Sequence, residues 1–158
     1  MFFDLHDSIL VQFVTIHRIF YSGLVAFHCF RETQDQFWMD RGRKAIKEME
    51  TWTEECKWNF ENKLLLLSAE YHFSMGDFDK ATDEYHLSIT SAHAHRFIHE
   101  EAIANELAAH FQLERGRKSV SIRFMNQAVE CYQTWGAAKK VKSLQVKMEN
   151  NQDAVFHE

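Results

Sequence analysis

The sequence predicts an all-α protein built from paired helices, and three observations carry that prediction. The 158 residues contain no proline and only five glycines, a composition that favours long helices with short connections over a sandwich or barrel. Apolar residues recur at helical spacing in seven segments, and one glycine-opened passage occurs twice. With 46% hydrophobic and 14% aromatic residues, the chain can bury one core of ordinary size.

The first predicted helix covers about 8–31 and is apolar on two sides. One stripe contains Phe13, Phe20 and Phe27, and a second contains Val14, Tyr21 and Val25. A helix that is apolar on two sides needs neighbours on two sides. We therefore expect neighbours on two sides of this helix, one of which need not belong to the given residues.

The second predicted helix, about 37–55, carries an unbroken apolar stripe through Gly42. The continuity of the stripe predicts that Gly42 lies inside the helix, at a cost of about 1 kcal/mol relative to alanine. The similar glycine at 116, which stands in the same tetrapeptide Arg-Gly-Arg-Lys, is instead expected to form a turn.

Five further helices follow from the same periodicity. The four consecutive leucines of 64–67 predict a helix buried on several sides, and Gly76 is expected to end that helix. Lysines on one face of the last helix indicate an end cap with a solvated side. The five predicted ranges are 59–74, 78–92, 98–114, 118–134 and 137–148.

The recurring passage is a tight turn that opens an amphipathic helix. It occurs first as Gly-Asp-Phe-Asp-Lys-Ala over 76–81, followed by Tyr85. Forty residues on (116 − 76), Gly-Arg-Lys-Ser-Val-Ser over 116–121 has the same layout and is followed by Met125. Helix-turn-helix repeats have spacings in this range, and such repeats usually form binding surfaces.

The first of these passages resembles the turn and second helix of a tetratricopeptide repeat (TPR). The spacing of forty exceeds that family's usual length of about 34, which implies longer helices. The resemblance implies a TPR-like helical-repeat solenoid of about three antiparallel helix pairs plus a C-terminal capping helix. We expect one domain over 8–148 and a polar tail over 149–158 that frays.

A longer likeness is carried by four segments in one order: 20–24, 59–63, 100–108 and 132–137, the last with Lys140. Together they resemble the TPR-like helical-repeat region of large hybrid sensor kinases from bacteria and unicellular algae. In that family the region follows a Ser/Thr-kinase-like domain and an AAA/STAND-type ATPase, and it precedes a GAF domain and a histidine-kinase or cyclase output. The resemblance covers about 18–144 and implies a non-catalytic interaction or intramolecular scaffolding module for signal transduction.

Analogy with TPR proteins places the first helix of each pair on the concave surface. That analogy nominates six partner-binding residues, Lys63, Glu70, Phe73, Glu106, His110 and Glu114. Leu66 and Glu106 stand where chaperone-binding members carry basic and amide residues, so a basic or apolar protein segment fits better than an acidic one. An ordinary solvated groove is the alternative reading of the same residues.

Half of the ten histidines fall within 86–110, which leaves an alternative function open. His95 and His99 are four residues apart, as metal ligands on one helix often are. The passage beginning at His99 departs from HExxH because Ile103 takes the place of the second histidine. Surface or capping histidines explain the segment better, and the alternatives are a metal-binding or catalytic helical bundle or a purely structural spacer.

Composition and missing motifs exclude several other classes. The net charge of −5 and pI near 6 argue against nucleic-acid or membrane partners. Phosphate-binding, dinucleotide-binding and nucleophile-elbow patterns are absent from the sequence, so we expect no enzyme activity, cofactor or resident metal. Three widely spaced cysteines and an acidic N-terminal stretch favour a cytoplasmic protein. The expected partner is a protein or peptide segment, including flanking domains of the same polypeptide.

Overall fold

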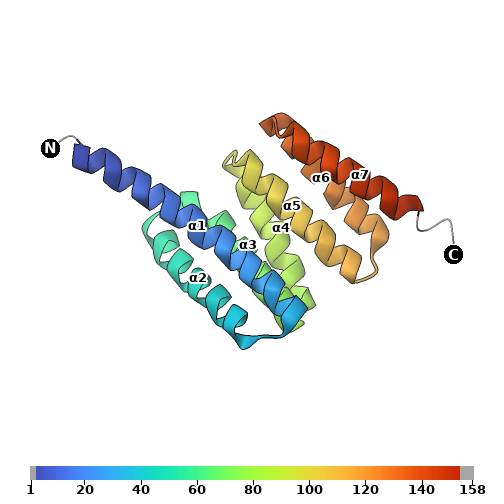
Figure 1. Ribbon diagram of the computed structural model, residues 1–158, viewed down its shortest axis with the longest axis horizontal. Coiled ribbons are helices and arrows are strands. Elements are labelled where there is room, and N and C mark those ends of the chain that lie inside the picture. Colours follow the sequence, from blue (N-terminus) through green and yellow to red (C-terminus); the bar gives the residue numbers. More distant parts are fainter. Residues whose placement is uncertain (1–2, 154–158) are drawn as a thin grey trace. The chain divides into compact units, whose positions relative to one another are not determined.

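Seven α-helices follow one another through residues 3–153, the part of the chain that the computed structural model describes, and no strand occurs there. Side chains are described for residues 14–148. The helices shown in Figure 1 are α1 (Phe3–Thr33), α2 (Gln36–Glu55), α3 (Lys57–Met75), α4 (Phe78–Ala94), α5 (Ile98–Glu114), α6 (Lys118–Trp135) and α7 (Ala138–Asp153). The predicted all-α class is confirmed, and the bounds predicted for α5 agree with the observed ones.

The chain divides into two compact units, residues 1–84 and 85–158, and the boundary falls inside α4. The single domain expected over 8–148 stays a prediction. Helix α7 continues to Asp153, so the first part of the expected polar tail is helical. The remainder of that tail, 154–158, lies outside the described residues.

In the first unit, α1, α2 and α3 pack against one another. Gly42 lies inside α2 as predicted and is buried against α1. A Cβ atom at Gly42 would lie 2.4 Å from Cε1 of Phe27, a distance that real Cβ contacts essentially never reach. Gly23 of α1 is equally close to its neighbours, because a Cβ atom added there would lie 2.7 Å from side-chain atoms of Ala45 and Leu67. Two glycines thus let three helix backbones approach closely enough to bury the large rings beside them.

The second unit achieves close packing with alanines instead of glycines. Helix α5 packs on α6, and α6 packs on α7. Ala102 and Ala128 are fully buried in a core that also contains Tyr132 and Leu144. Tyr85 of α4 adds a buried ring whose centroid lies 5.1 Å from that of Phe111.

Three glycines end helices in the same way. Gly76, Gly116 and Gly136 have φ values of 78°, 73° and 86°. Each donates its N–H to the carbonyl three residues back, and the next residue donates to the carbonyl five back, the pattern of a Schellman turn. The turns predicted at 76 and 116 are therefore confirmed. Between α4 and α5, Arg96 donates to the carbonyl three residues back and Phe97 donates to the carbonyl five back. Arg96 has φ of 60°, an uncommon conformation for a residue with a side chain.

Helix α1 has 31 residues and is about 46 Å long at 1.5 Å per residue. Although that length exceeds the thickness of a bilayer core, none of the helices in the described part of the chain is apolar enough to cross a membrane. The first apolar stripe of α1 is buried at Phe20 and Phe27, whereas the second stripe, with Val14 and Val25, is exposed. The second stripe therefore has no covering neighbour at these two positions, which agrees with the expectation that one neighbour need not belong to the given residues.

Candidate functional site

Three of the six predicted partner-binding residues lie on α3 and face the interior of the first unit. Lys63, Glu70 and Phe73 are only 4%, 1% and 8% exposed. The Nζ of Lys63 donates to the backbone oxygen of Asn59 at 3.1 Å, one turn earlier in the same helix. These side chains are therefore largely withdrawn from solvent, and their role in partner binding stays a prediction.

Glu70 is bound by an arginine that lies on α1. Arg31 Nη2 donates to Glu70 Oε2 at 2.8 Å, and Nη1 donates to Ser74 Oγ at 3.1 Å. The guanidinium carbon lies 4.2 Å from the centroid of the Phe73 ring, within the range of a cation–π contact. Because a buried charge is costly without a partner, this cluster ties α1 to α3 and fixes both charged groups.

The other three predicted residues lie on α5, in the second unit. Glu106 accepts hydrogen bonds from Tyr132 Oη at 2.8 Å and from Lys140 Nζ at 2.7 Å. His110 Nε2 lies 4.0 Å from Glu106 Oε1, and the His110 side chain is about half exposed. Glu114, the last residue of α5, is exposed. The Glu106 side chain is itself only 13% exposed, so His110 and Glu114 are the two residues of this half that a partner can reach.

A shallow hollow of about 250 Å³ lies between α2 and α3, and the sequence analysis did not predict it. Exposed Arg43 and Glu50 of α2 stand at its edge, and the other four lining residues are Ile46, Ser68, Tyr71 and His72. Its volume is below the roughly 300 Å³ at which small-molecule pockets begin. The hollow can exchange hydrogen bonds with a single side chain of a partner.

Two residues that line this hollow, Ser68 and His72, also contact Glu84 of α4. Ser68 Oγ donates to Glu84 Oε1 at 2.8 Å, and His72 Nε2 lies 3.7 Å from the same oxygen. Partial burial raises the pKa of the Glu84 carboxyl, and the hydrogen bond from Ser68 opposes that rise. The four-residue spacing of Ser68 and His72 on one helix was the available sequence signal for these two residues.

The histidines of 86–110 each have a different neighbour. The ring of His86 lies 5.4 Å from that of Phe124, and His93 Nδ1 lies 3.0 Å from Glu101 Oε1. The ring of His99 stacks on Trp135 at 5.1 Å. Aromatic and carboxylate contacts of this kind suit surface histidines, and the metal-binding alternative stays a prediction.

The three cysteines are free and half-buried. Burial and the nearby Glu101 carboxylate raise the pKa of the Cys131 thiol to about 11. A thiol with a raised pKa is a poor nucleophile at neutral pH, because the thiolate is the reactive form. Cys131 therefore has the properties of an inert core thiol.

Comparison with known proteins gives one informative similarity. The chain is 27% identical over 108 residues to a protein called hybrid signal transduction histidine kinase G from Dictyostelium discoideum. The aligned stretch is 68% of this chain but only 3% of that protein's length. No protein-family profile and no solved structure matches the chain. The predicted relation to a hybrid sensor kinase is confirmed at this coarse level.

Proposed function

We propose that this chain is a non-catalytic interaction or intramolecular scaffolding module of a sensor-kinase-type signalling protein. The observation that carries the proposal is the similarity over 108 residues to a hybrid histidine kinase. Because the similar stretch is a small part of that protein, a supporting role beside other domains suits the chain better than the kinase activity itself. The proposed setting is the cytoplasm, where such a module would bind protein segments.

The recurring turns support the TPR-like part of this proposal. The Schellman turns at Gly76 and Gly116 are forty residues apart (116 − 76), and each joins two consecutive helices. Paired helices joined by repeated short turns are the building unit of α-helical solenoids. A TPR-like arrangement would present the first helix of each pair to a partner.

The partner surface we propose is the exposed part of α5. Glu106 is held in place by Tyr132 and Lys140, while His110 and Glu114 are accessible beside it. Glu106 is already paired with Lys140, so the exposed carboxylate of Glu114 is the group that an approaching cation would meet. A basic protein segment is therefore the partner that this surface fits best, whether it belongs to a flanking domain or to another chain.

The proposal is tested by the size and chemistry of the native polypeptide. An antibody raised against this chain is used to precipitate the protein from source cells, and the precipitate is incubated with radiolabelled ATP. We expect a labelled band far larger than 18.8 kDa, with the acid-labile label of phosphohistidine. The purified 158-residue chain is the matched control and should take up no label.

A single unlabelled band at 18.8 kDa would contradict a place within a sensor kinase. Labelling of the purified chain would contradict its non-catalytic character. Loss of peptide binding in Glu114→Lys, measured with a lysine-rich peptide, would identify the α5 surface, and unchanged binding would exclude it.

A further inference from the structure

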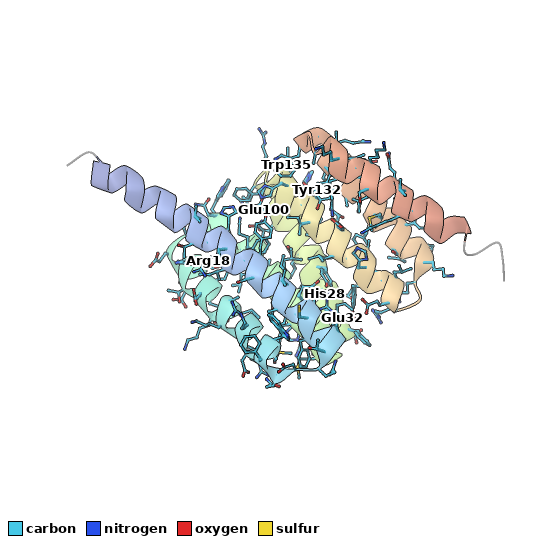
Figure 2. The ribbon with its side chains drawn as sticks, in the orientation of Figure 1. Arg18, His28, Glu32, Glu100, Tyr132 and Trp135 are labelled. Carbon is cyan, nitrogen blue, oxygen red and sulfur yellow. The ribbon has the colours of Figure 1, made fainter. Side chains whose placement is uncertain are left out.

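The exposed face of α1 has the spacing of a coiled-coil seam. Between positions 14 and 32 the exposed residues are Val14, Arg18, Tyr21, Val25, His28 and Glu32. Their intervals are 4, 3, 4, 3 and 4, the alternation by which one side of a helix meets another helix along its length. Figure 2 labels Arg18, His28 and Glu32 along α1.

Three of the six residues on this face are large and apolar. Val14, Tyr21 and Val25 are 61%, 40% and 55% exposed. The Tyr21 ring also lies 5.2 Å from the buried Phe20 ring, which restricts its orientation. The rest of the α1 surface packs on α2 and α3, and these two helices hold α1 in place.

Charge is distributed symmetrically about Val25. Arg18 lies seven residues before it (25 − 18) and Glu32 seven residues after it (32 − 25), about 10 Å to either side along the helix axis. Within the described residues, neither Arg18 nor Glu32 has an ion-pair partner. The face therefore carries opposite charges at equal distances from an apolar centre.

We propose that α1 of one chain pairs antiparallel with α1 of a second copy, about a two-fold axis at Val25. In that arrangement Arg18 of each copy lies opposite Glu32 of the other, and the two Val25 side chains meet at the centre. Tyr21 of each copy comes beside His28 of the other. A two-fold interface uses one patch twice, and this patch is self-complementary in charge.

A parallel pairing is disfavoured by the same residues. It would place Arg18 against Arg18 and Glu32 against Glu32, and like charges directly opposed are destabilising. The opposite charges at matched positions also favour a second copy of this chain as the partner of this face. The pairing does not depend on the proposed signalling role.

Sedimentation velocity over a range of concentrations tests the pairing. The unmodified chain is expected to shift from the 18.8 kDa monomer toward twice that mass as concentration rises. Val25→Lys, which places two charges on the axis, is expected to remain monomeric. Val25 is exposed, so the variant should keep its fold, which circular dichroism checks.

Charge reversal tests the orientation. Arg18→Glu and Glu32→Arg should each weaken the dimer roughly ten- to hundredfold, because two attractive pairs become repulsive. The double variant Arg18→Glu/Glu32→Arg should restore the original dissociation constant, and an equal mixture of the single variants should form heterodimers. Lys47→Glu on the exposed face of α2 is the matched control and should change nothing.

Two results would overturn the proposal. One is an unmodified chain that stays monomeric at all concentrations. The other is a dimer that survives Val25→Lys and both single charge reversals, since its interface must then lie elsewhere or run parallel.

Discussion

Glu70 of α3 and Glu106 of α5 are carboxylates on helices that each end in a Schellman turn, yet the two units use them differently. Glu70 is buried and bound by Arg31 from α1. Glu106 is bound by Tyr132 and by Lys140, a lysine with a partly exposed side chain, next to the half-exposed His110. The neighbouring helices therefore decide how much of each carboxylate stays exposed, which is 2% of the Glu70 side chain and 13% of the Glu106 side chain.

The largest expected effect comes from Glu70→Ala. Removing the carboxylate leaves the largely buried Arg31 charge without its counter-ion, which should lower the free energy of unfolding by about 3 kcal/mol. Urea denaturation followed by circular dichroism measures the loss. Glu48→Ala removes a carboxylate from the exposed Lys44–Glu48 pair on α2 and should cost less than about 0.5 kcal/mol. Equal losses in the two variants would contradict the difference between buried and surface pairs.

Gly42→Ala should have the next largest effect on stability. The added Cβ would meet the Phe27 ring at 2.4 Å, so overpacking of about 1–3 kcal/mol outweighs the gain in helix propensity of about 1 kcal/mol. Thermal unfolding should therefore show a lowered midpoint. Ser143→Ala is the control: it changes helix propensity on the exposed face of α7 without changing packing. It should raise the thermal unfolding midpoint slightly. A stabilised Gly42→Ala variant would mean that α1 and α2 do not approach as closely as described.

Tyr132→Phe should have a smaller effect in the second unit. The change removes one hydrogen bond to Glu106 and leaves the bond from Lys140, so the expected loss is about 1 kcal/mol. The same urea experiment measures it. A loss as large as that of Glu70→Ala would show that Glu106 is as deeply integrated into its unit as Glu70.

The smallest effect on stability is expected for Glu101→Gln. The effect of this variant is measured through the reactivity of the Cys131 thiol. The Glu101 carboxylate contributes to raising the pKa of Cys131 to about 11, so at pH 8 only about one thiol in a thousand is ionised. Removing the negative charge should lower this pKa and speed alkylation of Cys131 by iodoacetamide at pH 8, as followed by mass spectrometry. An unchanged rate would mean that burial alone controls the thiol.

Local features of the fold could be predicted from the sequence, because they depend on nearby residues. The bounds of α5 followed from apolar spacing, and the turns at Gly76 and Gly116 followed from glycine's freedom to adopt positive φ. Gly42 was placed inside α2 because the apolar stripe continued through it. Each of these inferences used a window of fewer than about twenty residues.

Features that depend on distant residues could not be predicted in this way. Arg31 lies 39 positions before Glu70, and no helix-by-helix pattern shows that the two meet. For the same reason the sequence did not predict that Ser68 and His72 of one helix contact Glu84 of the next. The second stripe of α1 was recognised as apolar, but periodicity alone does not say whether a neighbour covers it.

The coupling free energy between Arg31 and Glu70 tests the contrast between the two units most directly. It is obtained from the unfolding free energies of the unmodified chain, Arg31→Ala, Glu70→Ala and the double variant. We predict a coupling of at least about 2 kcal/mol, because each single change leaves a buried charge that the double change removes. A coupling below about 0.5 kcal/mol, typical of exposed ion pairs, would contradict the internal role of Glu70.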